Sequence, residues 1–278
     1  MFIPLLHTMV RRQLLRQGIQ SRQIPLGHGM LHYYEASPQA PRSTIVLIHG
    51  LGTSASTWVN VLPALARTHR VLAPDLPGFG LSSPMDGIPT LEDFADFTER
   101  FVDHAAPDSF VLLGHSLGGW ITMKYAVKHR PRVNHLILMN TAGIYYRGVD
   151  ELRDLFSLRS SRDTRKLLDR IWGTYPWYFR VFTSFIHEDL LRRKVPQIVQ
   201  SVREQDFMNA DLQYLTMRVS VLWGERDRLI PKDTVRILEE KLPARDIHIL
   251  EEAAHVPQLQ TPELLLGTLN TILQEDLL

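Results

Sequence analysis

The stretch FVLLGHSLGGW, residues 110–120, carries an apolar run directly into a serine that lies between glycines. Residues 110–113 suit a buried parallel strand, because such a strand is covered on both faces and its side chains need not alternate in polarity. From Trp120 the chain continues without glycine or proline as far as Pro131, which predicts a helix. Ser116 is therefore predicted at a strand-to-helix junction.

Residues 114–118, GHSLG, have the G-x-S-x-G spacing of a nucleophile elbow, in which small residues let the chain turn sharply and present a strained serine. Because this turn opens a helix, the backbone N–H groups after the serine are unpaired and face whatever the serine attacks. The alternative is an ordinary glycine-rich turn, which is common between a strand and a helix. These five residues alone do not decide between the two.

A serine hydroxyl is a weak nucleophile at neutral pH, so an elbow needs a histidine base and a carboxylate that orients it. In this arrangement the partners follow in the order serine, acid, histidine, each on a loop after a strand. The stretch VSVLWGERDRLIP, residues 219–231, predicts a strand followed by Asp227. The stretch DIHILEEAAHVPQLQTPE, residues 246–263, predicts the next strand followed by His255.

Each of these residues has an ordinary alternative. The alternative for Asp227 is to cap the following helix or to pair with Arg226 or Arg228, and Glu225 is a rival acid, but Asp227 is the favoured acid. His255 is one of 12 histidines, but it stands in a small-residue turn after the last strand with a helix behind it. His115, inside the elbow, is poorly placed to serve as the base of Ser116, and we interpret it as a packing residue.

A carbonyl that is attacked by serine needs donors for the oxyanion that forms. The stretch LIHGLGTS, residues 47–54, ends a predicted strand with glycines that let the backbone offer an N–H toward the serine. The amides of Leu51 and Leu117 are the expected two donors of this oxyanion hole. A plain glycine turn is the alternative. The motif indicates an oxyanion hole only in combination with the elbow, the acid and the histidine.

Short apolar runs alternate with helical patterns along the chain, which predicts a parallel sheet with helices on both faces. Before them, two segments around Gly27-His28-Gly29 predict an antiparallel hairpin. We therefore expect an α/β fold with an eight-stranded, mostly parallel sheet. The runs are STIVLIHG, HRVLAPDLPG, SFVLLGHS, VNHLILMNTAG, VSVLWGERD and DIHILEEAAH.

The rhythm of strands and helices breaks for about 70 residues after Asn140, far longer than the usual connection of 2–6 residues in an α/β unit. An inserted helical cap explains this length. The predicted division is an N-terminal segment 1–18, a core domain in two parts and a cap between those parts. The core parts are residues 19–144 and 218–278, and the cap is 145–217.

Composition excludes several classes of protein. The 278 residues carry a net charge of only +1, which gives no electrostatic case for binding nucleic acid. The absence of cysteine excludes disulfides and thiol catalysis, and it fits a reducing, cytoplasmic compartment. No sequence motif for a metal, a nucleotide or a dinucleotide occurs, so no cofactor is expected.

The motifs HGLG, DLPGFGLSS, GHSLGG, WGERDRLIP and AAHVPQLQTPE, taken together and in this order, resemble the α/β-hydrolase fold family from Gly18 to the C-terminus. Within the family the sequence looks like the serine esterase and lipase branch, including monoacylglycerol lipase-like proteins. By this resemblance Asp75 is a structural turn residue. Two departures concern the histidine loop: Ala254 stands where the family usually has glycine, and Gln260 where glutamate is common.

The resemblance implies a serine carboxylic-ester hydrolase that forms an acyl-enzyme on medium or lipid-like esters such as monoacylglycerols. Haloalkane dehalogenases and typical epoxide hydrolases use aspartate at the elbow, so Ser116 favours acyl chemistry. The alternatives are a carbon-carbon bond hydrolase of aromatic ring-cleavage products, with Arg153 or Arg180 holding a carboxylate, and a cofactor-free perhydrolase. A non-enzymatic ligand receptor is disfavoured because all three catalytic positions hold competent residues.

The cap contains the aromatic stretch WGTYPWYFRVFTSF, residues 172–185. An acyl chain or aromatic acyl group would suit aromatic walls, although the same side chains would equally form the cap's own core. The residues expected to line the substrate pocket are Trp172, Tyr175, Trp177, Tyr178 and Phe182.

Residues 1–18 begin apolar and then turn basic, which is the wrong order for a secretory signal, and no stretch is long enough to span a membrane. We expect a helix packed on the domain. The alternative is an amphipathic segment in peripheral contact with a membrane surface. That alternative turns Phe2, Ile3, Leu5, Leu6, Leu14 and Leu15 inward and Arg11, Arg12 and Arg16 toward the headgroups.

Overall fold

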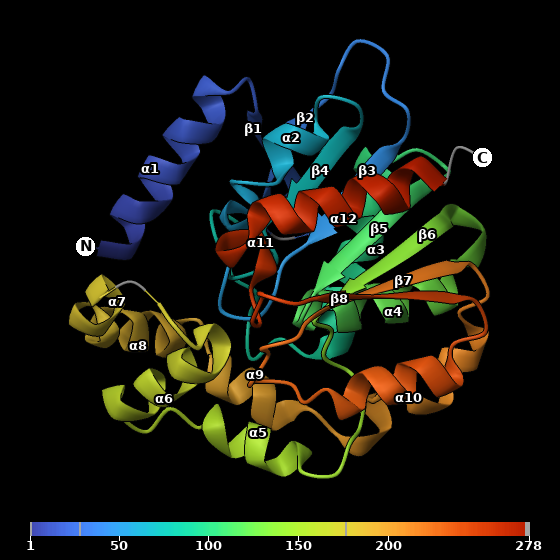
Figure 1. Ribbon diagram of the computed structural model, residues 1–278. Helices are drawn as coiled ribbons and strands as arrows, with labels where there is room; N and C mark the ends of the chain where they lie inside the picture. Colours follow the sequence, from blue (N-terminus) through green and yellow to red (C-terminus); the bar gives the residue numbers. More distant parts are fainter. Residues whose placement is uncertain (1, 28, 176, 276–278) are drawn as a thin grey trace.

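One sheet of eight strands forms the centre of the molecule, in the order β1-β2-β4-β3-β5-β6-β7-β8 (Figure 1). The computed structural model describes residues 2–27, 29–175 and 177–275. The strands are β1 (Gln20–Leu26), β2 (Gly29–Ala36), β3 (Thr44–Ile48), β4 (Arg70–Pro74), β5 (Phe110–His115), β6 (Val133–Met139), β7 (Arg218–Gly224) and β8 (Arg245–Leu250).

Strand directions confirm the predicted eight-stranded, mostly parallel sheet. β2 runs antiparallel to both β1 and β4, and every other pair of neighbouring strands is parallel. The predicted hairpin is formed by β1 and β2, although His28 of its turn lies outside the described residues. All residues of β3 and β5 are buried, as expected for strands with covered faces.

Two apolar cores lie on the two faces of the sheet. In β5, Phe110 and Leu112 join the core that contains α3 and α4, while Val111 and Leu113 join the core that contains α2 and α12. Successive side chains of a strand point to opposite faces, so this short run serves both cores. The helices are α2 (Leu62–Leu65), α3 (Leu91–Ala105), α4 (Leu117–Lys128), α10 (Asp233–Lys241), α11 (Pro257–Gln260) and α12 (Pro262–Glu275).

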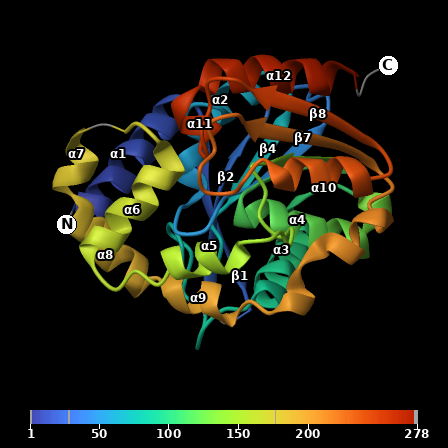
Figure 2. The ribbon, with the colours of Figure 1, turned by 60° about the horizontal axis from the view of Figure 1, so that its bottom comes forward.

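The chain between β6 and β7 forms the helices α5 (Val149–Leu155), α6 (Ser161–Trp172), α7 (Trp177–Val181), α8 (Thr183–Arg192) and α9 (Val195–Ser201), followed by short 3-10 turns. We call residues 145–217 the cap. Figure 2 shows the cap helices gathered beside one end of the sheet. α6 begins after the hydroxyl of Ser160, which accepts from the Asp163 amide, and ends at Gly173, whose φ is 65°.

An additional helix, α1 (Phe2–Arg16), precedes the hairpin. Leu14 is fully buried in the core that contains α12, whereas Leu6 and Leu15 are 46% and 45% exposed. The domain therefore covers only part of the apolar side of α1, and Leu6 and Leu15 lie outside that contact. The side chains of Phe2, Ile3 and Leu5 lie outside the described residues. In the described ranges no helix has the length and apolar character needed to cross a membrane.

Candidate active site

Ser116 lies at the sharp turn between β5 and α4, with φ 55° and ψ −119°. A non-glycine residue in this region of backbone space is strained by roughly 1–3 kcal/mol. The neighbouring glycines allow the turn: a Cβ on Gly114 would lie 2.4 Å from the Gly118 carbonyl oxygen, and a Cβ on Gly118 would lie 2.2 Å from that of Ile48. Close backbone packing therefore requires glycine two residues before and after the serine.

A chain of hydrogen bonds links the three predicted catalytic side chains. The Ser116 Oγ lies 3.0 Å from His255 Nε2, and His255 Nδ1 lies 2.8 Å from Asp227 Oδ2. Because an ionised carboxylate only accepts, the proton on Nδ1 faces Asp227 and the lone pair of Nε2 faces the serine hydroxyl. The structure thus brings together residues from the ends of β5, β7 and β8.

The carboxylate of Asp227 is buried and accepts several hydrogen bonds. Its Oδ1 accepts from the amides of Leu229 (2.8 Å) and Ile230 (3.1 Å). Burial alone would raise the pKa of Asp227, but the charge and hydrogen bonds of its partners, above all His255, outweigh burial and lower that pKa. The rival acid Glu225 is exposed. Asp227 is therefore held ionised where it orients the imidazole.

Sequence reasoning missed Asn140, the residue directly after β6. Its Nδ2 donates to Asp227 Oδ2 at 2.7 Å, and its Oδ1 accepts from the Gly224 amide at 3.3 Å. Asn140 has a φ of 44°, a conformation that asparagine adopts more readily than most residues. The only signal in the sequence was an amide side chain at the end of a predicted strand, next to the strand that carries the acid.

The loop of His255 is bonded to the cap. The His255 amide donates to the Ile171 carbonyl at 3.1 Å. Gln260 Oε1 accepts from the amides immediately before and after His255, at 3.2 and 3.4 Å, while its Nε2 donates to the Trp172 carbonyl at 2.8 Å. A glutamate carboxylate would accept in the same way but would have no N–H for Trp172. Glutamine at this position thus joins the histidine loop to the end of α6.

His115 supports the same loop. Its Nε2 donates to the His255 carbonyl at 2.7 Å, and its Nδ1 lies 3.3 Å from Gln258 Nε2. Burial, together with the charge of His255, lowers the pKa of His115 to about 3, so the ring is neutral. Its position agrees with its interpretation as a packing residue, and the hydrogen bond adds a positioning role.

The loop after β3 lies against the serine. His49 donates from Nδ1 to the Gly50 carbonyl (2.9 Å) and accepts at Nε2 from the Leu76 amide (2.9 Å), which fixes the start of this loop. Burial lowers the pKa of His49 to about 4. Leu51 and Leu117 both line the cavity that Ser116 lines. Their amides have no backbone acceptor among the described residues, so both are available to a substrate oxygen.

Asp75 has the structural place that the resemblance implied. Its buried carboxylate bonds His32 Nδ1 (2.7 Å) and accepts from the amides of Ala55 (2.7 Å) and Leu81 (2.9 Å). Burial alone would raise the pKa of Asp75, but the hydrogen bond and charge of His32 outweigh it and lower the pKa. Asp75 therefore ties the loops after β3 and β4 together and does not touch the serine.

An apolar cavity of about 90 Å³ opens on Ser116. Its walls come from the loop after β3, the start of α4, the segment after β6, the loop after β7, and cap helices α5 and α9. The lining residues are Leu51, Ser116, Leu117, Trp120, Ala142, Gly143, Ile144, Tyr146, Val149, Leu152, Arg153, Phe156, Ile198, Val199, Val202, Phe207, Leu229 and Ile230.

None of the five aromatic residues expected in the pocket lines this cavity: Trp172, Tyr175, Trp177, Tyr178 and Phe182. α6 ends at Gly173, and the rings of the aromatic stretch that follows pack on one another around Phe179. Trp177 is 74% exposed. The aromatic rings that do line the cavity include Trp120 and Phe207, stacked with centroids 5.0 Å apart.

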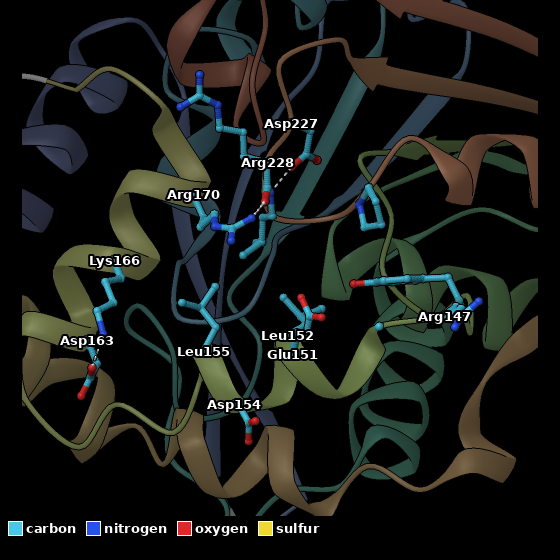
Figure 3. Close-up of a pocket in the computed structure, with 14 residues that line it drawn as sticks. Arg147, Glu151, Leu152, Asp154, Leu155, Asp163, Lys166, Arg170, Asp227 and Arg228 are labelled. Atoms are coloured by element: carbon cyan, nitrogen blue, oxygen red, sulfur yellow. Dashed lines mark hydrogen bonds and ion pairs between the residues drawn. The ribbon is translucent and has the colours of Figure 1, made fainter.

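A second, polar pocket of about 620 Å³ lies beside the Asp227 loop, between α5 and α6 (Figure 3). It shares Tyr146, Leu152 and Leu229 with the apolar cavity. Arg170 reaches from α6 toward this loop and donates to the Arg228 carbonyl at 3.2 Å (Figure 3). Within the described residues no group of histidine and carboxylate side chains is arranged to hold a metal ion.

Residues 45–267 match the model of the alpha/beta hydrolase family, and the chain belongs to this family. A strained serine at the elbow, bonded to a histidine and facing a cavity under a helical insertion, is consistent with that membership. Together they define the protein as a hydrolase of the α/β fold.

Several known proteins resemble the chain over most of its length. It is 24% identical over 273 residues to 2-hydroxy-6-oxo-2,4-heptadienoate hydrolase of Pseudomonas putida, covering 90% of this chain and 91% of that protein. It is 24% identical to Lipase 1 of Psychrobacter immobilis, covering 88% and 81%. A crystal structure of a membrane phospholipase A, described as a bacterial virulence factor, superposes with a TM-score of 0.86 at 25% identity, covering 99% and 93%.

Proposed function

We propose that the protein is a serine ester hydrolase that works through an acyl-enzyme. The observation that carries this proposal is the hydrogen-bonded chain from Ser116 through His255 to Asp227, with the serine facing an apolar cavity. The family match and the relatives of this chain, which include lipases and esterases, support the same function.

In the proposed reaction, His255 Nε2 takes the proton of Ser116 Oγ as the oxygen attacks the ester carbonyl. Asp227 stabilises the imidazolium that forms, and the amides of Leu51 and Leu117 donate to the oxyanion. His255 then gives the proton to the departing alcohol. Water repeats the sequence on the acyl-enzyme and releases the acid, leaving Ser116 as it began.

The apolar cavity is the proposed site of the acyl group. Its volume of about 90 Å³ is smaller than the roughly 150 Å³ of an engineered cavity that binds benzene. A short acyl group therefore fits the structure as it stands, and a medium or lipid-like chain requires the cap walls to separate. The polar pocket next to it suits the alcohol product.

A carbon-carbon bond hydrolase is the second candidate, because the curated relatives include hydrolases of heptadienoate and muconate semialdehyde products. Of the two arginines considered for the substrate carboxylate, Arg153 lines the cavity. Its guanidinium already donates to Asp150 (3.2 Å) and to the Val202 carbonyl (2.9 Å). Arg180 lies outside the cavity lining, over the ring of Tyr175. Because both guanidinium groups already have partners within the protein, neither is free to hold a substrate carboxylate, and ester substrates are favoured.

The test is a series of p-nitrophenyl esters from acetate to palmitate, assayed with the wild-type protein and with Ser116→Ala. We expect serine-dependent turnover that is fastest for short acyl chains and falls as chains outgrow the cavity. Loss of the serine should lower kcat on the order of 10⁶-fold, by analogy with another serine triad. Turnover of a ring-cleavage product with no ester turnover would establish the second candidate instead.

A further inference from the structure

The most exposed apolar side chains of the molecule gather on helices from two distant parts of the sequence. Within the described residues, eight of the fourteen exposed large apolar side chains belong to α1, α7 and α8. They include the three most exposed of all: Trp177 (74%), Val181 (61%) and Met9 (59%). Leu6 and Phe185 belong to the same group, each 46% exposed.

These helices lie together in space. α1 contacts α8, α7 contacts α8, and Figures 1 and 2 show α1 on the same side of the molecule as α7 and α8. His7 of α1 lies close enough to Arg193 and Asp189, at the end of α8, for their charges to shift its pKa, which burial lowers. We call the exposed residues of α1, α7 and α8 the α1–α8 face. An exposed apolar concentration of this kind marks an interaction site.

The α1–α8 face is basic, although the whole chain is nearly neutral. α1 contains three arginines and no acidic residue, whereas the full sequence has 31 basic and 30 acidic side chains. α8 contains Asp189 and the exposed Glu188, and Asp189 is paired with Arg192 and Arg193. α7 carries Arg180 and no acid. In the described parts of the chain no carboxylate lies within ion-pair distance of Arg12, Arg16 or Arg180. Arg12 and Arg16 are therefore free to meet an external anion, whereas Arg180 lies over the ring of Tyr175.

We propose that the α1–α8 face docks the protein on an anionic lipid bilayer. Interfacial helices combine apolar side chains that enter the acyl boundary with basic residues that meet anionic headgroups. Tryptophan and tyrosine, as at Trp177 and Tyr178, favour the same boundary because one end of each ring system is apolar and the other polar. A second copy of the chain is a poorer occupant, since a two-fold contact would bring together two faces of the same net positive charge.

The inner side of α8 connects this face to the active site. A Cβ on Gly52, in the loop that presents the Leu51 amide, would lie 2.8 Å from Leu190 of α8. α8 also contacts α9, whose Ile198 lines the apolar cavity. Docking therefore brings the bilayer to the outer surface of the cavity wall. The inference that substrates come from the bilayer rests on the proposed function, whereas binding of the protein to the bilayer does not.

The experiment is co-sedimentation of the full chain with vesicles of phosphatidylcholine alone or mixed with phosphatidylglycerol, at low and high salt. Wild-type protein should bind the anionic vesicles and be released by salt. The double variant Arg12→Glu/Arg16→Glu and the variants Met9→Asp and Trp177→Asp should each weaken binding at least tenfold, since one basic residue alone contributes roughly fivefold at an anionic surface. The matched controls are Arg236→Glu and Leu264→Asp, which lie outside the face and should bind as wild type.

In the vesicle experiment two outcomes overturn the proposal: equal binding to both vesicle types, including no binding to either, and controls that lose as much binding as the variants of the face. Circular dichroism shows whether each variant is folded. Trp177 fluorescence, assigned with Trp177→Phe, gives a second measurement, because insertion predicts quenching by brominated lipid. Size-exclusion chromatography with light scattering detects a dimer that Trp177→Asp dissociates, which would assign the face to a second copy. Ester turnover is recorded separately, so its failure is distinguished from failure to bind.

Discussion

At the scale of single residues, one carboxylate connects the elements that make the site. Asp227 bonds the imidazole of His255 and accepts from Asn140 and from the amides that follow it in its own loop. The sequence predicted Ser116, Asp227 and His255 because each follows a buried strand in a motif of characteristic spacing. It did not predict Asn140, since the role of that residue depends on a contact between neighbouring strands.

Asn140→Ala tests this contact. The substitution removes a hydrogen bond to a buried ionised group, which is worth about 1.5–3 kcal/mol, so we expect kcat/KM for a short ester to fall about 10- to 100-fold. Asn134→Ala is the control, because Asn134 lies in the same strand but is exposed. If Asn140→Ala turned over substrate as fast as the control, Asn140 would have no role in holding the acid.

At the scale of elements, α6 and the histidine loop form one connected unit. The carbonyls of Ile171 and Trp172 accept from His255 and Gln260, so the position of the cap bears directly on the general base. The sequence predicted the cap as an insertion of unusual length. The aromatic side chains expected in the pocket lie outside the lining of the apolar cavity, and their packing on one another around Phe179 is not specified by any local pattern.

Gln260→Glu tests the connection between cap and base. The variant keeps the size of the side chain and its acceptors for the loop amides, but a carboxylate faces the Trp172 carbonyl without a proton. We expect kcat to fall about tenfold and amide hydrogen exchange to rise at the C-terminal end of α6. The matched change Gln274→Glu, at an exposed position of α12, should alter neither. A fall in kcat with unchanged exchange would refute a role for the cap bond.

At the scale of the whole molecule, the fold was predictable because local patterns agree with it. Buried runs such as β3 and β5 are apolar throughout, and the motifs follow one another in the order that the parallel sheet requires. The cavity was not predictable in detail. Phe207 and Ile198 line the same cavity as Ser116 because of the path of the cap, which no local pattern specifies.

Stability should depend on pH through two buried histidines. The pKa values of His49 and His115 are lowered from 6.5 to about 4 and about 3, mainly by burial. The unfolded chain therefore binds more protons below pH 6.5, and stability falls as the pH drops from about 6.5 toward 4. Through each histidine, the free energy of unfolding should fall by about 2 kcal/mol between pH 7 and pH 5.

Urea unfolding at pH 7 and pH 5 measures this dependence. In His115→Gln the pH-dependent loss should be smaller by the share of one histidine, whatever the effect of the substitution on stability at pH 7. His104→Gln, on the exposed end of α3, is the control and should keep the wild-type difference. An unchanged difference in His115→Gln would contradict the assignment of a neutral buried ring.

The most direct test of the central claim is to identify the residue that carries the acyl group. The protein is treated with a fluorophosphonate ester analogue, digested and analysed by mass spectrometry, with Ser116→Ala and His255→Ala alongside. We predict a single adduct on Ser116, absent in Ser116→Ala and formed at least a hundredfold more slowly in His255→Ala, because general-base catalysis contributes about 10²–10⁴-fold. An adduct on another residue, or labelling that persists without Ser116, would contradict the assignment of Ser116 as the nucleophile.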